Sequence, residues 1–513
     1  MSARSLMFQG TGSDVGKSLL VAGLCRWAKN RGIKVQPFKP QNMSNNAAVA
    51  EGNGEVGRAQ ALQAKASRVA PTVDMNPILL KPETDSGAQI VVQGKMFGRA
   101  TAREYQKLKP KLLPYVLESF EKIRKEADLL LVEGAGSTAE INLRTNDIAN
   151  MGFATAVNTP VILIGDIDRG GVIANLVGTK AVLPVDEAQL IKGFVINKFR
   201  GDVSLFASGV QEIEKRTQWQ GFGVIPWFQN ARKLPAEDAV SLKGEPASIR
   251  QQLKISVPRL SRIANFDDLD PLKNEPGVNL RIVEPGEPIN RDADLILIPG
   301  SKSTIGDLSF LVEQGWDVDI QAHIRQRKLV LGICGGYQML GKLVSDPLGI
   351  EGNVGTAPGL GLLDVTTKLT SEKAVTKVSG TDIKFGRKIT GYEIHIGSTY
   401  GPDCARPLVN IRSGNGKERL DGASSPNGLV LGTYVHGLFI EDEFRHAFLQ
   451  YCGLEKLSMS SFDLEIETTL DEFSEHLDKN IDVNNKISNN TNKSEEIKEP
   501  SSEKSINMNK EDR

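Results

Sequence analysis

A glycine-rich segment near the start of the chain has the residue types that bind phosphate. It lies between an apolar run at residues 5–9 and a helical pattern at residues 19–31, and it reads Gly10-Thr11-Gly12-Ser13-Asp14-Val15-Gly16-Lys17-Ser18. Successive backbone N–H groups and the start of the following helix can hold an anion there. Lys17 would contact the β- and γ-phosphates, and the Ser18 hydroxyl would bind Mg²⁺. The segment therefore predicts a nucleotide site.

The loop differs from the usual Walker A pattern in its spacing. Five residues separate Gly10 from Gly16, where that pattern has four, and Thr11 stands where its first glycine belongs. An ordinary glycine-rich turn is the alternative interpretation.

A cysteine in the second half of the chain is the other chemical centre. Cys334 follows an apolar run at residues 328–333 in the sequence Gly332-Ile333-Cys334-Gly335-Gly336, and a helical pattern comes next. A strand, a tight turn and a helix form the cysteine counterpart of a nucleophile elbow, which exposes the sulfur. A helix N-terminus lowers the pKa of a thiol, and the Gly335 N–H lies where an oxyanion would form. The pattern predicts a nucleophilic thiolate, with a buried structural cysteine as the alternative.

A thiolate nucleophile needs a base, and His436 is the best candidate among the five histidines. It follows Cys334 by about a hundred residues, in the order of the class I glutamine amidotransferases, which this half of the chain resembles. Most of that class carry a glutamate two residues after the histidine, whereas this chain has Leu438. The branch that holds the cobyric and cobyrinic acid synthases shares this difference. The group that orients the ring therefore stays open, with Glu441 and a backbone carbonyl as candidates. His395, in a motif of the same branch, has a structural or a site role.

A Pro-Gly loop upstream could complete the acyl-transfer site. Pro299, Gly300 and Ser301 come about 34 residues before Cys334, and they resemble the loop that supplies the second oxyanion donor in that class. Gly300, Ser301 and Gly335 are therefore predicted to bind the oxyanion. A simple turn after a strand would look the same.

Parallel sheets must position these segments. Apolar runs at residues 35–38, 129–132, 161–164 and 193–196 alternate with helical or polar stretches, and a second series lies at 254–257, 295–298, 328–333, 392–396 and 430–434. Such runs suit strands that are buried on both faces. We predict an α/β fold with two parallel-sheet domains. These are a P-loop NTPase-like domain at residues 1–240 and a flavodoxin-like glutamine amidotransferase domain at 252–455, with more antiparallel strands late in the second.

The composition favours small-molecule ligands. Sixty-two Lys and Arg against 63 Asp and Glu leave a formal charge of -1, so nothing indicates a nucleic-acid partner. No apolar run reaches the roughly 18–20 residues that span a membrane. Four widely separated cysteines disfavour disulfides and zinc, so we expect a cytoplasmic protein. Residues 480–513 have no aromatic residue and are predicted to be a disordered polar tail.

The longer phosphate loop resembles that of dethiobiotin synthetase and its relatives, and further residues extend the resemblance. Lys39 resembles a lysine that neutralises phosphate charge in that family. Glu133, after the run at 129–132, resembles an acidic residue that would coordinate Mg²⁺ directly or through water. Asn197 and Pro226 resemble segments that contact adenine.

Two polar segments should emerge on the phosphate side of the first sheet. The first, directly after Lys39 and Pro40, carries Gln41, Asn42, Asn45 and Asn46, and the second, after the Glu133 loop, carries Arg144 and Asp147. Amides and a guanidinium there could bind a substrate that carries many amides and carboxylates. Loop capping by asparagine is the alternative.

Three motifs make the resemblance more specific. KPQNMSNN (39–46), GRAQALQA (57–64) and MNPILLKP (75–82) resemble the adenosylcobyric acid synthase family, glutamine-hydrolysing enzymes of cobalamin biosynthesis. The resemblance covers about residues 5–452. It implies an ATP- and Mg²⁺-dependent ligase that amidates side-chain carboxylates of a corrinoid diamide through an acyl phosphate, with L-glutamine as the ammonia source.

Three other functions remain open at this point. Cobyrinic acid a,c-diamide synthase has the same two-part chemistry, although the QNMSNN segment argues against it. A non-catalytic P-loop ATPase of the partitioning type would leave the C-terminal domain without a role. The third is a cysteine hydrolase with an incidental nucleotide domain.

Overall fold

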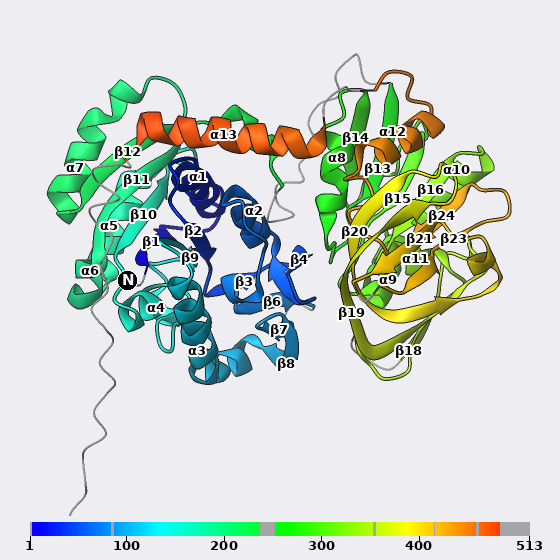
Figure 1. The fold of residues 1–513 in the computed structure, drawn as a ribbon, viewed down its shortest axis with the longest axis horizontal. Coiled ribbons are helices and arrows are strands. Elements are labelled where there is room, and N and C mark those ends of the chain that lie inside the picture. The colour runs from blue at the N-terminus through cyan, green and yellow to red at the C-terminus, as the bar shows by residue number, and fades with distance from the viewer. Residues whose placement is uncertain are drawn as a thin grey trace, which may run out of the picture.

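The computed structural model describes residues 3–83, 87–235, 252–351, 355–414, 416–457 and 461–482. Two α/β domains lie side by side, the first formed by residues 3–235 and the second by residues 252–457 (Figure 1). A final helix, α13 (Phe462–Asn480), runs back across the first domain (Figure 1).

The N-terminal domain is built on a parallel sheet of six strands in the order β12-β11-β10-β1-β9-β2. Because β1 lies between β9 and β10, the phosphate loop that follows it lies at the middle of the carboxyl edge, where open α/β sheets bind ligands. The strands are runs of buried aliphatic residues, as expected where helices cover both faces. Their bounds are β1 Arg4–Gly10, β2 Val35–Phe38, β9 Leu129–Ser137, β10 Val161–Asp166, β11 Ile191–Phe199 and β12 Gln220–Pro226.

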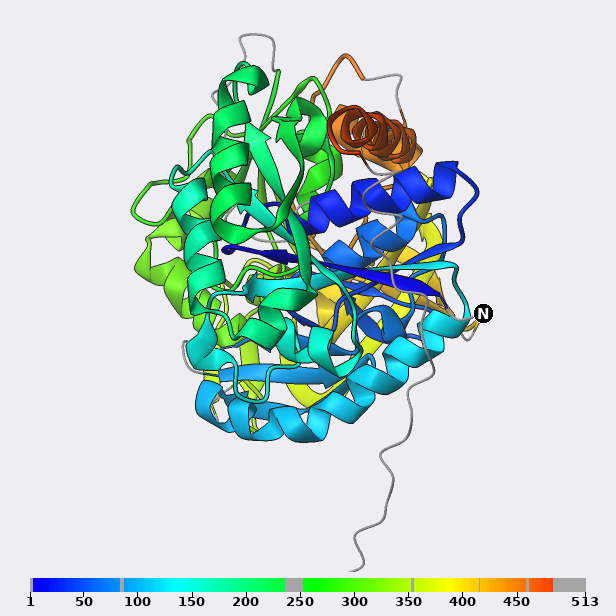
Figure 2. The same cartoon turned by 90° about the vertical axis from the view of Figure 1, so that its left-hand side faces the viewer.

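Helices cover both faces of this sheet (Figure 2). Leu6 and Phe8 of β1 pack in one apolar cluster with α1 and α13, while Met7 packs on the opposite face with α3 and α4. The helices are α1 Lys17–Asn30, α2 Arg58–Ala66, α3 Ala102–Lys125, α4 Met151–Ala156, α5 Val172–Val182, α6 Val185–Leu190 and α7 Ala207–Thr217.

Two small sheets between β2 and β9 contact the C-terminal domain. One has the order β3-β6-β7-β8, and the other pairs β4 with β5. Buried Ala47 and Leu79 of these sheets pack against Tyr392 and Ile394 of the second domain. The strands are β3 Gln41–Met43, β4 Ala47–Val49, β5 Glu55–Gly57, β6 Ile78–Pro82, β7 Gly87–Val92 and β8 Lys95–Thr101.

The C-terminal domain has its own central sheet, in the order β14-β13-β15-β16-β24-β23. All neighbours are parallel except β23 and β24. Its strands are β13 Leu253–Pro258, β14 Val278–Val283, β15 Leu295–Ile298, β16 Leu329–Ile333, β23 Ala423–Ser424 and β24 Val430–Thr433. Its helices are α8 Asp270–Lys273, α9 Thr304–Glu313, α10 Trp316–Arg325, α11 Gly335–Leu340 and α12 Asp442–Tyr451.

A second, mainly antiparallel sheet follows α11. Its long hairpin of β19 (Thr366–Asp382) and β20 (Lys388–Tyr400) brings the Tyr392–Ile396 segment next to the end of β24, through the bridge between Tyr392 and His436. The other strands are β17 Leu343–Asp346, β18 Gly355–Pro358, β21 Val409–Ser413 and β22 Glu418–Asp421. The predicted fold class, with two parallel-sheet domains and late antiparallel strands, is confirmed.

Helix α13 corrects the predicted start of the polar tail. The helix extends to Asn480, and the next residue, Ile481, is buried and bridges to Gly223 of the N-terminal domain. The helix therefore brings Asn480 and Ile481 onto the N-terminal domain, whereas the prediction placed both residues in the tail because of its polar composition. Residues 483–513 lie outside the described residues, and within the described ranges no helix is both long and apolar enough to cross a membrane.

Candidate active sites

The glycine-rich loop has the conformation that its sequence predicts. Gly16, at φ 93°, is the N-cap residue directly before α1, and Asp14, at φ 57°, is also left-handed. The Lys17 ammonium donates to the carbonyl of Gly12 at 3.1 Å and to that of Gly136 at 2.9 Å. The lysine is thus held across the loop between the ends of β1 and β9.

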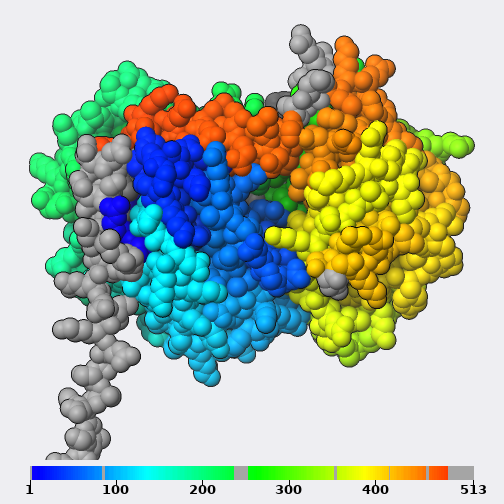
Figure 3. Space-filling model, viewed as in Figure 1, coloured from blue at the N-terminus to red at the C-terminus, as the bar shows by residue number. Residues whose placement is uncertain are grey.

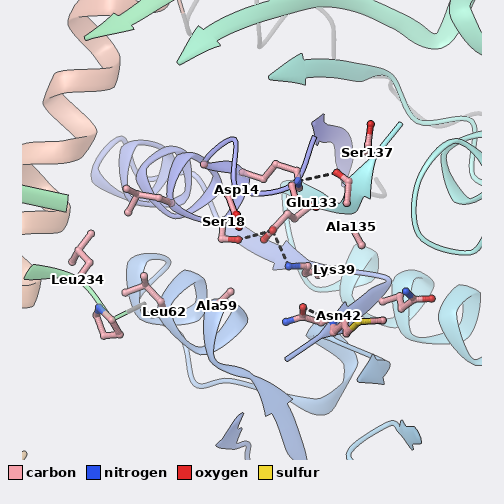
Figure 4. A pocket seen from close by; sticks show the side chains of 18 of the residues that line it. Asp14, Ser18, Lys39, Asn42, Ala59, Leu62, Glu133, Ala135, Ser137 and Leu234 are labelled. Atoms are coloured by element: carbon pink, nitrogen blue, oxygen red, sulfur yellow. Dashed lines mark hydrogen bonds and ion pairs between the residues drawn. The ribbon is translucent and has the colours of Figure 1, made fainter. Parts of the chain in front are cut away.

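Glu133 is fully buried at the end of β9 and is surrounded by donors. Its Oε1 accepts hydrogen bonds from Ser18 Oγ at 2.7 Å and from Lys39 Nζ at 2.8 Å (Figure 4). Its Oε2 accepts from Gln63 Nε2 at 2.6 Å, and Gln60 Nε2 lies 3.4 Å away. A buried carboxylate is costly unless it is paired, and here Lys39 supplies the opposite charge.

The donor set around Glu133 fits Mg²⁺ better than a transition metal. The described residues contain no cluster of three or more His, Cys, Asp or Glu side chains that could hold a metal. Mg²⁺ does not need one, because it is usually bound through one or two protein oxygens together with water and substrate phosphates. Ser18 and Glu133 are such oxygens, and they lie beside the phosphate loop.

A cavity of about 1150 Å³ opens at this loop, and both domains line it. The N-terminal domain contributes most of the residues predicted to bind nucleotide or substrate, and the C-terminal domain contributes Leu269, Asp270, Lys273 and part of β14. The space-filling view shows the two domains meeting below α13 (Figure 3). The predicted residues on the wall are Ser13, Asp14, Gly16, Lys17, Ser18, Lys39, Gln41, Asn42, Glu133, Arg144 and Asp147.

Some predicted residues lie near this cavity but not on its wall. Asn197 Nδ2 donates to the carbonyl of Val15 at 2.8 Å, so it holds the backbone of the phosphate loop in place. Asn45 and Asn46 lie in the turn before β4, where the carbonyl of Asn46 accepts from the Arg58 N–H. Their roles in nucleotide or substrate binding remain predictions.

Arg144 and Asp147 line the cavity but also have contacts of their own. Arg144 pairs with Glu187 at 2.5 Å. The Asp147 carboxylate accepts from the backbone N–H groups of Ala149, Asn150 and Gly152. Asp147 therefore shapes the loop that presents Arg144 to the cavity.

The C-terminal site is built on a strained turn. Cys334 has φ 53° and ψ -109°, between β16 and α11, a conformation that costs on the order of 1–3 kcal/mol and marks functional turns. Glycines make the turn possible, because a Cβ on Gly336 would lie 2.1 Å from the carbonyl oxygen of Ile298. The cysteine is buried against the carbonyl of Ile394, with Sγ at 3.7 Å from the oxygen.

His436 lies beside Cys334 and is oriented by an aspartate. Its Nδ1 is 2.7 Å from Asp268 Oδ2, and its own backbone pairs with that of Tyr392. Burial alone would lower the pKa of His436, but the charges of Asp268 and Cys334 outweigh burial and raise it to about 10. The ring is thus held ready to carry a proton taken from the thiol.

Neither candidate for the orienting group contacts the ring of His436 in this way. Glu441 instead accepts from Thr390 at 2.8 Å and from Lys388 at 3.0 Å, and a side-chain carboxylate, not a backbone carbonyl, contacts the ring. Asp268 lies 168 residues before His436, in the run Asp267-Asp268-Leu269-Asp270. The one available signal was this acidic cluster, which lies in the segment between β13 and β14.

The predicted oxyanion residues surround the same position. A Cβ on Gly335 would lie 2.8 Å from the Ser301 nitrogen, and a Cβ on Gly300 would lie 2.9 Å from His436 Cε1. Ser301 Oγ donates to the buried Asp307 at 2.5 Å, which fixes the Pro-Gly loop. The loop and the elbow are therefore in direct contact, as a two-donor oxyanion site requires.

His395 faces the same small cavity but is poorly suited to act as a base. Its ring stacks on Tyr434 with centroids 3.8 Å apart. Burial, together with the charges of Arg419 and His436, lowers the pKa of His395 to about 3. The ring stays neutral at physiological pH, which suits a packing role.

The folds and sites define a glutamine amidotransferase domain joined to a P-loop nucleotide-binding domain. Residues 254–444 match the CobB/CobQ-like glutamine amidotransferase domain, and residues 6–242 match the CobQ/CobB/MinD/ParA nucleotide binding domain. Curated relatives described as cobyric acid synthase are closely similar. The protein of Methylorubrum populi is 57% identical over 483 residues, which cover 93% of this chain and 97% of the relative.

Two further cobyric acid synthases give the same result. That of Cereibacter sphaeroides is 56% identical over 93% of this chain and 98% of its own length. That of Brucella canis is 55% identical over 94% and 98%. The chain belongs to the cobyric acid synthase family, and it is a glutamine-dependent amidotransferase of cobalamin synthesis.

Proposed function

We propose that this enzyme converts adenosylcobyrinic acid a,c-diamide into adenosylcobyric acid by amidating side-chain carboxylates, using ATP, Mg²⁺ and L-glutamine. The observation that carries the proposal is one chain with two complementary sites. A phosphate loop lies at a cavity of about 1150 Å³, and a strained cysteine lies beside a paired histidine and aspartate. The first suits carboxylate activation and the second suits release of ammonia.

In the N-terminal site, a substrate carboxylate oxygen attacks the γ-phosphorus of ATP, and the bond to the bridging oxygen of ADP breaks. Ammonia then attacks the carbonyl carbon of the acyl phosphate, and inorganic phosphate leaves with the amide formed. Lys17 neutralises charge that develops on the transferred phosphoryl group. Mg²⁺, held by Ser18 and Glu133, would supply further charge neutralisation on the phosphates. Lys39, beside Glu133, adds a second fixed cation.

In the C-terminal site, Cys334 Sγ attacks the side-chain amide carbon of glutamine. His436 accepts the thiol proton and passes it to the leaving nitrogen, which departs as ammonia. The N–H groups of Gly335 and Ser301 stabilise the oxyanion. Water then hydrolyses the thioester to glutamate and regenerates the thiol. Asp268 holds His436 in the tautomer that this sequence needs.

The cavity lining favours a large, amide-rich and anionic substrate. Its wall carries the amides of Gln41 and Asn42 and the cations Lys109, Arg144 and Lys273. The family relationship supports a corrinoid as that substrate. All four cysteines are free thiols, which supports the proposed cytoplasmic location. No nucleic-acid partner is part of the proposal.

A coupled assay tests this function. Glutamine hydrolysis and ATP-dependent amidation of the a,c-diamide are measured together. We expect Cys334→Ala to abolish synthesis with glutamine while synthesis with high external ammonium remains, because the sulfur serves only to release ammonia. Lys17→Ala should abolish synthesis with either nitrogen source. Cys452→Ala, at a cysteine away from both sites, is the control and should retain both activities.

The outcomes separate the other candidate functions. Amidation of cobyrinic acid itself, without turnover of the a,c-diamide, would identify the earlier a,c-diamide synthase reaction. Glutamine hydrolysis without any ATP-dependent amidation would identify a cysteine hydrolase. ATP hydrolysis without glutamine hydrolysis or amidation would identify a P-loop ATPase of the partitioning type.

A further inference from the structure

A short segment between β13 and β14 connects the two sites. It comprises residues 265–270, and we name it the relay segment. It contains the 3₁₀ helix η6 (Phe266–Leu269) and the start of α8. On one side it contacts His436, and on the other it contacts the N-terminal domain and the large cavity. Asn265 and three aspartates make the polar contacts, and Leu269 also lines the cavity.

Asn265 contacts the nitrogen of His436 that must receive the thiol proton. Its Nδ2 lies 3.2 Å from His436 Nε2. Its Oδ1 accepts from the Ala47 N–H of the N-terminal domain at 3.1 Å, and this fixes which end of the amide faces the ring. Nδ2 is a donor only, so while Cys334 keeps its proton and the ring is neutral, Nε2 is the acceptor of this hydrogen bond.

This arrangement opposes the catalytic role of the ring. A neutral imidazole has one acceptor nitrogen, and Asp268 already takes the Nδ1 hydrogen. The Asn265 N–H and the Cys334 S–H therefore compete for a single lone pair. Protonation of Nε2 would also place two donors against each other at 3.2 Å.

The relay segment is tied to the nucleotide site through α2. Arg58, the first residue of α2, pairs with Asp267 at 2.5 Å and donates to Tyr392 Oη at 2.6 Å. The ring of Tyr392 stacks on that of His436 with centroids 5.3 Å apart and 18° between planes. Further along α2, Gln60 and Gln63 donate to Glu133, the carboxylate beside the phosphate loop.

The other end of the segment faces the large cavity. Asp270 and Lys273 are part of its wall. Asp270 Oδ2 is buried and accepts no hydrogen bond within the described part of the chain. Burial and the neighbouring Asp267 raise the pKa of Asp270 well above its usual range. A ligand in the cavity could supply the missing donor, and Asp270 is only two residues from Asp268.

We infer that Asn265 is a positioning residue that holds His436 in an inactive hydrogen-bonding pattern until ligands occupy the cavity. Ligands that contact Asp270, or that change the Glu133 contacts with α2, shift the relay segment and withdraw the Asn265 amide from Nε2. The thiol proton then has its acceptor. Ammonia is released only when an acceptor substrate is present. This inference rests on the proposed glutaminase roles of Cys334 and His436.

The test compares glutamine hydrolysis with and without ATP plus the a,c-diamide. In Asn265→Ala, hydrolysis without these ligands should rise by about two- to tenfold, the change that one neutral hydrogen bond corresponds to. The stimulation by ligands should fall by the same factor. Asn265→Asp is a second variant that keeps the acceptor for the Ala47 N–H and the left-handed backbone at φ 51°. Glutamine hydrolysis by this variant without the ligands should also rise, because a carboxylate cannot donate a hydrogen bond to Nε2.

A second measurement separates positioning from damage. The rate of Cys334 alkylation against pH should have a lower midpoint in both variants, because the donor that opposes the imidazolium is gone. A disrupted site would move the midpoint upward. Glu83→Gln is the control, since it breaks the interdomain pair with Lys302 without touching the relay segment, and it should leave the stimulation ratio unchanged.

Two results would overturn the inference: an unchanged ratio in both Asn265 variants, or a fall in hydrolysis with and without ligands. Absence of glutamine hydrolysis by the unmodified enzyme under both conditions would instead refute the proposed function, and the inference with it.

Discussion

Very few groups decide whether the ring of His436 is charged or neutral. The side chain has almost no contact with solvent, so an isolated imidazolium there would be unstable. Asp268 on Nδ1 and the sulfur on the other side reverse this preference. The thiol proton can therefore move to His436 without leaving the site.

Replacing Asp268 should remove this reversal. In Asp268→Asn, the pKa of His436 should fall from about 10 toward its ordinary value, because burial then acts without the compensating charge. We expect glutamine hydrolysis to drop by roughly 10²–10⁴-fold, the usual contribution of a positioned base, with ammonium-dependent synthesis retained.

The pH dependence of Cys334 alkylation checks this assignment. The proton leaves the sulfur more readily when the imidazolium is stabilised, so loss of Asp268 should move the alkylation midpoint to higher pH. Glu441→Gln, at the other carboxylate considered for this role, should leave the midpoint in place. A shift in Glu441→Gln rather than in Asp268→Asn would contradict the observed pairing.

Residues within local motifs could be predicted from the sequence, and residues that meet only in the fold could not. Lys17, Ser18 and Cys334 are identified by neighbours a few positions away, which also fix the backbone around them. Asp268 and Asn265 reach His436 across about 170 residues. Nothing in a single sequence pairs such positions, because their contact depends on how β13 and β24 sit in one sheet.

At the scale of elements, helix α13 is the part that sequence reasoning left unassigned. Apolar runs marked the buried strands because helices cover both of their faces. An amphipathic helix shows only that one face will be buried, not what buries it. In this protein, α1 of the N-terminal domain buries that face of α13. The two helices pack so closely that a Cβ on Gly23 would lie 2.5 Å from the Phe473 ring.

Truncating Phe473 should therefore destabilise the N-terminal domain. The side chain is 4% exposed and packs in the same cluster as α1. Loss of a buried phenylalanine typically costs about 3–5 kcal/mol, so we expect Phe473→Ala to lower the thermal midpoint markedly and to weaken ATP binding. Leu464→Ala on the same helix, at a residue 64% exposed, should change the midpoint little. Equal effects would show that α13 does not dock in solution.

At the scale of the whole molecule, a buried ion cluster joins the domains. Glu55 of β5 pairs with Lys81 at 2.8 Å and with Lys373 of the C-terminal domain. Burial alone would raise the pKa of Glu55, but Lys373 and Lys81 outweigh it and lower it to about 2. Its charge is thus present across the physiological range.

Neutralising Glu55 should weaken the interdomain contact in a pH-dependent way. In Glu55→Gln, two lysines lose their partner, which costs about 3–5 kcal/mol for a buried pair. Because the folded pKa lies below the model-peptide value of roughly 4.3, the stabilisation is fully present above that pH and is lost as pH falls toward about 2.

Denaturant unfolding of both proteins between pH 2 and 7 measures this difference. The gap in unfolding free energy should be largest above about pH 5 and should close in acid. Glu287→Gln breaks a solvent-exposed pair with Arg281 and should cost under about 1 kcal/mol. A gap for Glu55→Gln that did not change with pH would contradict the assigned charges.

The ribosome completes helix α13 only after it has made both domains, yet that helix covers the apolar face of α1, which emerges among the first residues. At elongation rates of roughly 5–20 residues per second, the stretch from residue 235 to residue 462 takes on the order of 10–50 s. During that time the leucines and Trp27 of α1 lack their final cover. We therefore expect the nascent N-terminal domain to expose an apolar face that chaperones bind, and we expect that domain, produced without α13, to aggregate.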